Sequence, residues 1–120
     1  MPTPSPELNP DHVLRMAQEA LEIEAQAVRD LGLRLGADFV QAVSALLATQ
    51  GRVVVMGMGK SGHVGRKIAA TLASTGTASM FVHPAEASHG DLGMIETRDT
   101  VLAISNSGES EELTTILPVL

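Results

Sequence analysis

The sequence contains no cysteine and almost no aromatic side chains. Its 120 residues include no Cys, Trp or Tyr and only two Phe. The lack of cysteine excludes disulfides and thiolate metal clusters. The shortage of aromatic rings argues against a protein that stacks the bases of single-stranded nucleic acid. The core must therefore be built from Ala, Val, Leu, Ile and Met, which suits helices packed closely on a parallel sheet.

Positive charge is scarce, and long hydrophobic runs are missing. The chain has 8 Lys and Arg against 14 Asp and Glu, a net charge of -6, which would repel a phosphate polymer. The longest apolar runs are strand-sized, far below the roughly 20 residues of a membrane-spanning helix. No basic segment followed by an apolar one marks a secretion signal. We expect a soluble, cytoplasmic protein with neither nucleic acid nor membrane as a partner.

The amino-terminal part predicts a lead-in and two helices. The stretch "MPTPSPELNP" contains four prolines and no apolar period, which predicts a disordered lead-in over residues 1–9. Asn9 is a suitable N-cap, with Pro10 at the first helical position, and apolar residues then recur at helical spacing to about Leu31. A second helix is expected from about Phe39 to the segment "TQGR".

From about residue 52 the pattern alternates between strands and helices. The runs "RVVVMG", "ASMFVH" and "DTVLAISNSG" predict strands, while "GHVGRKIAATLAST" and "ESEELTTILPVL" predict helices. This order is typical of an α/β fold with a parallel sheet flanked by helices and joined by right-handed crossovers. Such apolar strands are expected to be covered on both faces. Because the sequence stops after three strands, we expect a domain truncated within a longer one.

The first polar loop is "GMGKSGHVG", residues 57–65. It matches the dinucleotide fingerprint G-x-G-x-x-G through three glycines, Gly57, Gly59 and Gly62. However, His83 stands near the end of the second strand, where a dinucleotide site needs an acidic residue for the ribose. A P-loop is excluded because Val54 occupies its first glycine position. Close backbone approach, a helix N-terminus and Lys60 favour a small anionic ligand, and the alternative is a simple tight turn.

The second polar loop, "SNSGES", follows the third predicted strand. It presents the hydroxyls of Ser105, Ser107 and Ser110 without a basic residue, a combination that suits one phosphate group held by hydrogen bonds. The alternative is a capping loop, in which Ser107 or Ser110 caps the next helix and Glu111 or Glu112 complements its dipole. A similar loop on a neighbouring strand favours ligand binding over capping.

Two histidines lie in the polar segment between these loops, "VHPAEASHGDLGMI". His83 and His89 are six residues apart in a predicted loop, and we expect both to lie at one pocket. Histidine is a metal ligand or proton carrier when it converges with carboxylates, although two lone histidines are more often hydrogen-bonded structural groups. His12 and His63 are interpreted as surface residues.

Three stretches together resemble a known family: "GMGKSGHVGRKIAATLASTGT", "FVHPAEASHGDLGMI" and "AISNSGESEEL". In this order they resemble the sugar isomerase (SIS) domain of the D-arabinose-5-phosphate isomerases, over residues 10–120. The resemblance implies a Rossmann-like α/β sandwich that assembles as a homotetramer. It also implies interconversion of D-ribulose 5-phosphate and D-arabinose 5-phosphate through an enediol, for synthesis of the octulosonate sugar (Kdo) of lipopolysaccharide.

The resemblance also implies roles for particular residues. Lys60 and Glu112 are the implied catalytic residues: Lys60 suits oxyanion stabilisation, and Glu112 is either the base or an orienting group. The implied substrate contacts are Ser61, Gly76, Thr77, His83, His89, Ser105, Ser107, Ser110 and Thr115. No cofactor is required by this chemistry, and the resemblance implies a candidate zinc contact only at His83.

The sequence departs from the family in one respect. Family members carry a further glutamate and histidine, and most carry CBS domains, beyond the point at which this sequence stops, so we expect little or no activity from these residues alone. Two alternatives remain open: a regulatory SIS module that binds a sugar phosphate, and an isomerase of another phosphosugar. Lys60 together with Glu112 favours the enzyme, because a sensor needs the phosphate loop but no acid–base pair.

Overall fold

A computed structural model describes residues 7–120, which cluster into two compact units that divide between residues 40 and 41. Most of the predicted disordered lead-in, residues 1–6, lies outside the described residues. In the first unit, helix α1 (Pro10–Arg34) begins where predicted, because the Asn9 side chain accepts a hydrogen bond from the His12 N–H at 3.2 Å. It ends three residues beyond the predicted Leu31.

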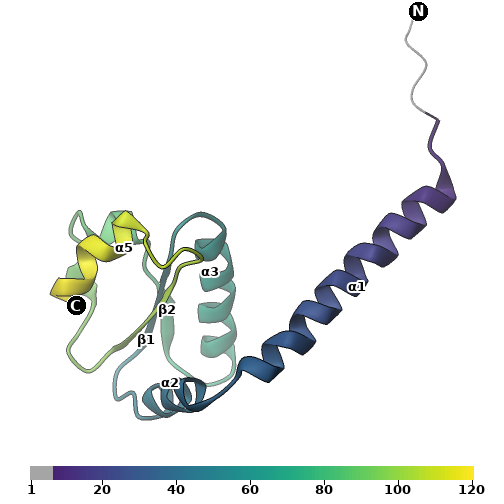
Figure 1. Ribbon diagram of the computed structural model, residues 1–120. Coiled ribbons are helices and arrows are strands. Elements are labelled where there is room, and N and C mark those ends of the chain that lie inside the picture. Colours follow the sequence, from purple (N-terminus) through teal and green to yellow (C-terminus); the bar gives the residue numbers. More distant parts are fainter. Residues whose placement is uncertain (1–6) are drawn as a thin grey trace, which may run out of the picture. The chain divides into compact units, whose positions relative to one another are not determined.

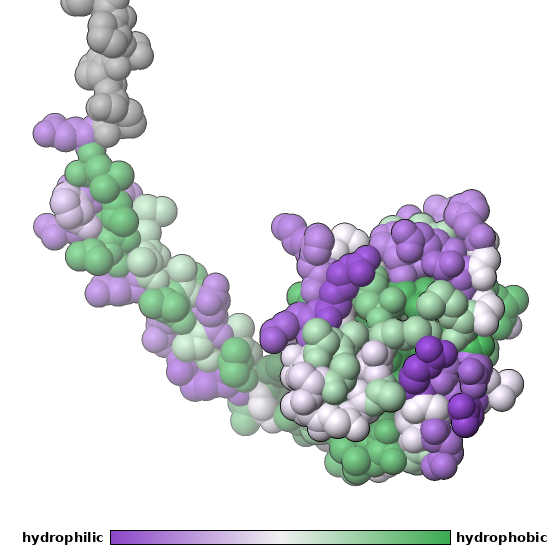
Figure 2. All heavy atoms as spheres, turned by 180° about the vertical axis from the view of Figure 1, so that it is seen from behind, coloured by the Kyte–Doolittle hydropathy of each residue, from purple (hydrophilic) through white to green (hydrophobic). Residues whose placement is uncertain are grey.

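Helix α1 is amphipathic, and its apolar side chains are exposed. None of its residues is buried, and Figure 2 shows apolar side chains along the helix. The exposed apolar residues include Val13, Leu14, Leu21, Val28 and Leu31. Among the described residues, no helix is both long and apolar enough to cross a membrane. Helix α2 (Ala37–Leu47) follows and ends before "TQGR", as predicted.

The second unit contains the predicted strands and helices in the predicted order. They are β1 (Val53–Gly57), α3 (Gly59–Ser74), β2 (Ser79–Phe81), α4 (Pro84–Ala87), the 3-10 turn η1 (Asp91–Met94), β3 (Thr100–Ile104), α5 (Glu111–Ile116) and the 3-10 turn η2 (Leu117–Val119). The two short elements α4 and η1 form within the segment predicted as a polar loop.

The three strands form a parallel sheet in the order β2-β1-β3. In its register Val53 pairs with both Ser79 and Thr100, and Gly57 pairs with Ile104. All five residues of the central strand β1 are buried, which confirms that this strand is covered on both faces. Because the strands are parallel, their carboxyl ends, and the polar loops that follow them, lie at one edge of the sheet.

Alternate side chains of β1 enter two separate cores. On one face, two side chains of β1 pack with one of α4 and two of α5. These are Val54 and Met56, Ala87, and Leu113 and Ile116, respectively. On the other face, Val53 and Val55 of β1 pack with Ala69 of α3. Helices α3 and α5 therefore lie on opposite faces of the sheet (Figure 1).

At the amino edge of the sheet, one carboxylate joins β1 to the segment before β3. Asp99 accepts hydrogen bonds from the backbone N–H of Arg52 at 2.7 Å and of Glu96 at 2.8 Å, and its side chain is only 1% exposed. These two backbone donors, Arg52 first, hold the pKa of the Asp99 carboxyl below its ordinary value of 3.8. Gly51 passes so close to Asp99 that a Cβ atom at this position would collide with its carboxylate.

Candidate functional site

The connections of the sheet define a topological switch point at its carboxyl edge. After β1 the chain enters α3 on one face, and after β3 it enters α5 on the opposite face. The connection at Met58, which leads into α3, and loop 105–110 therefore diverge between two neighbouring strands. In open α/β sheets, ligands bind in the crevice that such divergence creates. Both sequence-predicted polar loops lie at this point.

The turn after β1 depends on close backbone contact. A Cβ atom on Gly62 would lie 2.6 Å from the Gly57 carbonyl oxygen, and Gly59 has a φ of +54°, a conformation that favours glycine. This compact turn lets α3 begin at Gly59, three residues earlier than the segment "GHVG" predicts. Lys60 and Ser61 therefore lie in the first helical turn, rather than in a loop before it.

The first turn of α3 offers both a charge and free backbone donors. Met58 occupies the N-cap position and makes no side-chain capping bond, so the helix N-terminus is left open to a ligand. Lys60 is exposed, and within residues 7–120 the ion pairs are formed by other cations, Arg29, Arg52 and Arg98. The ammonium group of Lys60 is therefore available to an anion.

In the second polar loop, two serine oxygens fix the backbone. Ser105 Oγ accepts a hydrogen bond from the Gly108 N–H at 3.0 Å, and Ser107 Oγ accepts one from the Glu109 N–H at 3.1 Å. Each hydroxyl acts as an acceptor in these bonds, so its own proton remains available for donation. The loop is thus preorganised and still presents two hydroxyl donors.

Ser110 stands at the N-cap position of α5 but does not cap it. Its hydroxyl instead donates a hydrogen bond to Glu112 Oε2 at 3.1 Å, so Ser110 occupies the N-cap position of the alternative interpretation without making its capping bond. The reason is local, because the carboxylate competes with the backbone for the same hydroxyl. The bond orients Glu112, which lines a cavity of about 210 Å³ together with Thr115, Ser88 and Glu111.

The two histidines line one cavity, as predicted. His83 follows β2, and its Nδ1 accepts a hydrogen bond from the Ala85 N–H at 3.2 Å, which leaves Nε2 as the donor of the neutral ring. His83 and His89 line a cavity of about 560 Å³ with Ala85 and two carboxylates, Glu86 and Asp91. The sequence analysis did not select Glu86 or Asp91, although both lie in the histidine-bearing segment.

The cavity contains residue types that can bind zinc, but they are not grouped as a metal site. Within residues 7–120, no group of three or more His, Cys, Asp or Glu side chains is arranged to hold a metal ion. Zinc at His83 therefore stays a prediction, since zinc sites need at least three protein ligands, which the described part of this chain does not bring together.

His63 is exposed, as predicted, but it also lines a cavity. This cavity, of about 140 Å³, lies beside the start of α3 and includes His83, Arg66 and Phe81. The Arg66 guanidinium lies 4.3 Å from the centre of the Phe81 ring, a cation–π distance. The residues around the first loop are therefore more basic than Lys60 alone indicates.

Gly76 and Thr77 lie away from the other predicted substrate contacts. They connect the end of α3 to the start of β2, at the amino edge of the sheet, where they line a cavity of about 270 Å³ with Thr49 and Gly51. Lys60, His83 and the second polar loop (residues 105–110, called the serine loop below) all lie at the carboxyl edge. Within one chain, these two groups of residues lie at opposite ends of the strands.

Comparison with known proteins finds a matching domain family and proteins of similar sequence. The SIS domain family matches residues 46–120, which contain the whole sheet and both polar loops. Arabinose 5-phosphate isomerase KdsD of Pseudomonas aeruginosa is 63% identical over 107 residues, covering 89% of this chain and 33% of that protein. KdsD of Escherichia coli K12 is 54% identical over 115 residues, covering 95% and 35%.

A solved structure, that of an E. coli CFT073 protein in complex with arabinose 5-phosphate, superposes with a TM-score of 0.88 at 43% identity, covering 93% of this chain and 60% of that one. The chain spans about a third of the length of the curated relatives it matches. Since the matching family segment includes more than half of the sequence, the chain belongs to the SIS domain family.

Proposed function

We propose that this chain is the sugar-phosphate-binding part of an aldose–ketose isomerase that interconverts D-ribulose 5-phosphate and D-arabinose 5-phosphate. The observation that carries the proposal is the convergence at one sheet edge of an unpaired lysine, a hydroxyl-rich loop and a pair of histidines. The identity of 54–63% to proteins named arabinose 5-phosphate isomerase, and the likeness to a structure that contains arabinose 5-phosphate, support this substrate.

The proposed chemistry is proton transfer between adjacent carbons. A base removes the proton from C2 of the open-chain aldose while the carbonyl oxygen at C1 takes up a proton, which gives a 1,2-enediol. The hydroxyl at C2 then loses its proton as C1 gains one, and the ketose results. Among the residues of this chain, Glu112, His83 and His89 are the candidates for carrying the carbon-bound proton. Lys60 stabilises the negative charge that develops on oxygen.

Binding of the phosphate is assigned to the serine loop. The free hydroxyl protons of Ser105 and Ser107 supply neutral donors, and the hydrogen bonds they accept hold the loop ready for the ligand. Lys60, in the first turn of α3 after the neighbouring strand β1, is then left for the reacting end of the sugar. This division of labour lets binding and catalysis be tested separately.

We further propose that the complete enzyme is a cytoplasmic homotetramer that acts in synthesis of the octulosonate of lipopolysaccharide. The isomerisation involves no net oxidation, so it is balanced without a redox cofactor. The resemblance implies a contact from Gly76 and Thr77 to the sugar, and such a contact would need a second copy of the chain, because both residues lie at the amino edge of the sheet. A regulatory SIS module remains the alternative, and it predicts binding without turnover.

The role of Lys60 can be tested in a chimaera in which this chain replaces the matching segment of the Pseudomonas aeruginosa relative. Lys60→Ala should lower kcat by about a hundredfold or more, with inorganic phosphate affinity nearly unchanged. Lys67→Ala is the matched control, because Lys67 is also exposed on α3 but lies two turns from its start. An unchanged kcat in Lys60→Ala would remove Lys60 from the mechanism.

A further inference from the structure

The segment that carries the histidine cavity runs from the carboxyl edge of the sheet, where β2 ends, to the amino edge, where β3 begins. It leaves β2 at His83 and returns at Met94, the last residue of η1, before β3 begins. Its internal hydrogen bonds are short-range, such as His89 N–H to Glu86 O at 3.0 Å and Ile95 N–H to Leu92 O at 3.0 Å. Within the described chain, one hydrogen bond ties residues 83–95 to a distant element: Arg52 Nη2 donates to Met94 O at 2.7 Å.

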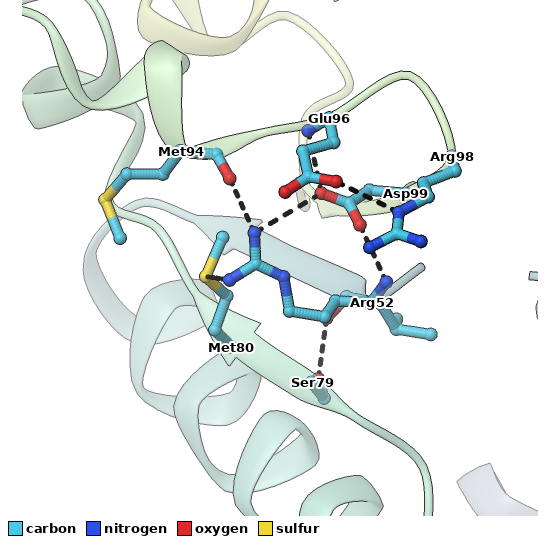
Figure 3. A network of polar contacts seen from close by, with 8 residues as sticks. Arg52, Ser79, Met80, Met94, Glu96, Arg98 and Asp99 are labelled. Atoms are coloured by element: carbon cyan, nitrogen blue, oxygen red, sulfur yellow. Dashed lines mark hydrogen bonds and ion pairs between the residues drawn. The ribbon is translucent and has the colours of Figure 1, made fainter. Parts of the chain in front are cut away.

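Arg52 is itself held firmly by the amino edge of the sheet (Figure 3). Its backbone N–H donates to the almost completely buried Asp99 carboxylate, and its carbonyl accepts from the Thr100 N–H at 3.0 Å. Its guanidinium lies 3.7 Å from Asp99 Oδ2 and 3.3 Å from Met80 Sδ of β2. The guanidinium that donates to Met94 is therefore held by Met80 of β2 and by Asp99, the residue before β3.

Two glycines, one before η1 and one within it, place little packing restraint on this turn. Gly90 has a φ of +128°, and neither Gly90 nor Gly93 has other atoms close to the position of a Cβ. Leu92 and Ile95 pack against the core as half-buried side chains, which gives apolar contact but little directional restraint. The charged hydrogen bond from Arg52 is the directional restraint at the end of the turn.

We propose that Arg52 is a positioning residue for the sugar site. By holding Met94 O, the guanidinium fixes η1 and so sets the place of Asp91 and His89 relative to His83, although Arg52 lies at the opposite edge of the sheet from His83. The inference rests on the proposed function in one respect, that the ligand of the cavity is a sugar phosphate. Arg52 touches no substrate and acts through the geometry of the segment.

The test compares Arg52→Gln, Arg52→Lys and Arg98→Gln in the 120-residue chain by ¹H–¹⁵N NMR titration. Arg98 is the control because it pairs with Glu96 at 3.0 Å on the same connection but makes no bond to Met94. Arg52→Gln should bind D-arabinose 5-phosphate about tenfold more weakly, which corresponds to one charge-assisted hydrogen bond. Arg52→Lys should restore most of the affinity, and Arg98→Gln should match the unsubstituted chain.

Inorganic phosphate separates positioning from general destabilisation. Arg52→Gln should bind phosphate as the unsubstituted chain does, because the serine loop follows β3 at the carboxyl edge of the sheet, away from Arg52, while the amide resonances of His89 and Asp91 shift. Equal loss of phosphate and sugar phosphate, or unfolding that lysine does not rescue, would overturn the inference and leave Arg52 a purely structural group. Unchanged sugar affinity with unmoved His89 and Asp91 resonances would overturn it as well.

The two proposals fail in different ways. An unsubstituted chain that binds phosphate but not D-arabinose 5-phosphate overturns the proposed function. Movement of the His89 and Asp91 resonances in Arg52→Gln would still support the positioning of the cavity in that case. Conversely, sugar binding that Arg52→Gln does not weaken leaves the proposed function standing and rejects the positioning role.

Discussion

Replacement of Gly62 by alanine measures how closely α3 must approach the end of β1. The added Cβ would lie 2.6 Å from the Gly57 carbonyl oxygen, about 0.8 Å short of the 3.4 Å at which ordinary contact begins. Gly57 ends a fully buried strand and pairs with Ile104, so the helix rather than the strand has to move. Overpacking of this kind costs about 1–3 kcal/mol.

This displacement has two measurable consequences. Urea unfolding of the chain should show Gly62→Ala to be less stable by about 2 kcal/mol, and the Tm should fall by roughly 8 °C. Lys60 lies in the same helical turn, and a misplacement of about 1 Å can cost on the order of a hundredfold in rate. In the chimaera described above, kcat should therefore fall by more than the loss of stability alone explains.

Gly32→Ala is the matched control for this substitution. Gly32 lies inside α1, has nothing within 4 Å of its Cβ position, and should gain about 0.5–1 kcal/mol of helix stability on the same change. If Gly62→Ala proves as stable as the unsubstituted chain, the close contact between Gly62 and Gly57 does not determine the turn. The placement of Lys60 would then need another explanation.

Three further substitutions test the core, the amino edge of the sheet and the serine loop. Met56→Ala should lower the free energy of unfolding by about 3 kcal/mol in urea titration, because Met56 is fully buried, and a loss below about 1 kcal/mol would contradict its place in the core. Because the pKa of Asp99 is lowered in the folded state, its stabilising effect should be complete above about pH 4 and lost as the pH falls through the folded value. The difference in free energy of unfolding between the unsubstituted chain and Asp99→Asn should therefore shrink on acidification. A difference that stays constant with pH would refute this. Ser107→Ala should weaken inorganic phosphate about tenfold in NMR titration, since it removes a donor and the acceptor of the Glu109 N–H, and unchanged affinity would remove Ser107 from the phosphate site.

The sheet and its helices could be predicted because their signals are local and periodic. The β-branched run of β1 and the helical spacing after Asn9 are visible in the sequence, and the structure follows both. The earlier start of α3 was missed because it depends on a positive φ at Gly59, which apolar periodicity does not report. Helix α4 and the turn η1 were missed because elements of four residues carry almost no periodicity.

The candidate site was predictable where its residues directly follow strands. His83 and His89 could be assigned to one cavity from their spacing, but Glu86 and Asp91 join them only through the folding of α4 and η1. The contact between Arg52 and Met94 joins positions 42 residues apart, so no local pattern indicates it. The hydrogen bond from Ser110 to Glu112 was not predicted either, because a side-chain partner two residues away competes with the backbone for the hydroxyl.

The central claim is that these residues bind a pentose phosphate and move its carbon-bound proton. The most direct test incubates the chimaera with D-arabinose 5-phosphate in deuterated water and follows ketose formation and deuterium entry at C2 by NMR. The account predicts both, together with their loss in Lys60→Ala despite retained phosphate binding. A folded chimaera that binds the sugar phosphate without exchange or conversion, while the intact relative shows both, would contradict the account and favour a regulatory sugar-phosphate-binding module.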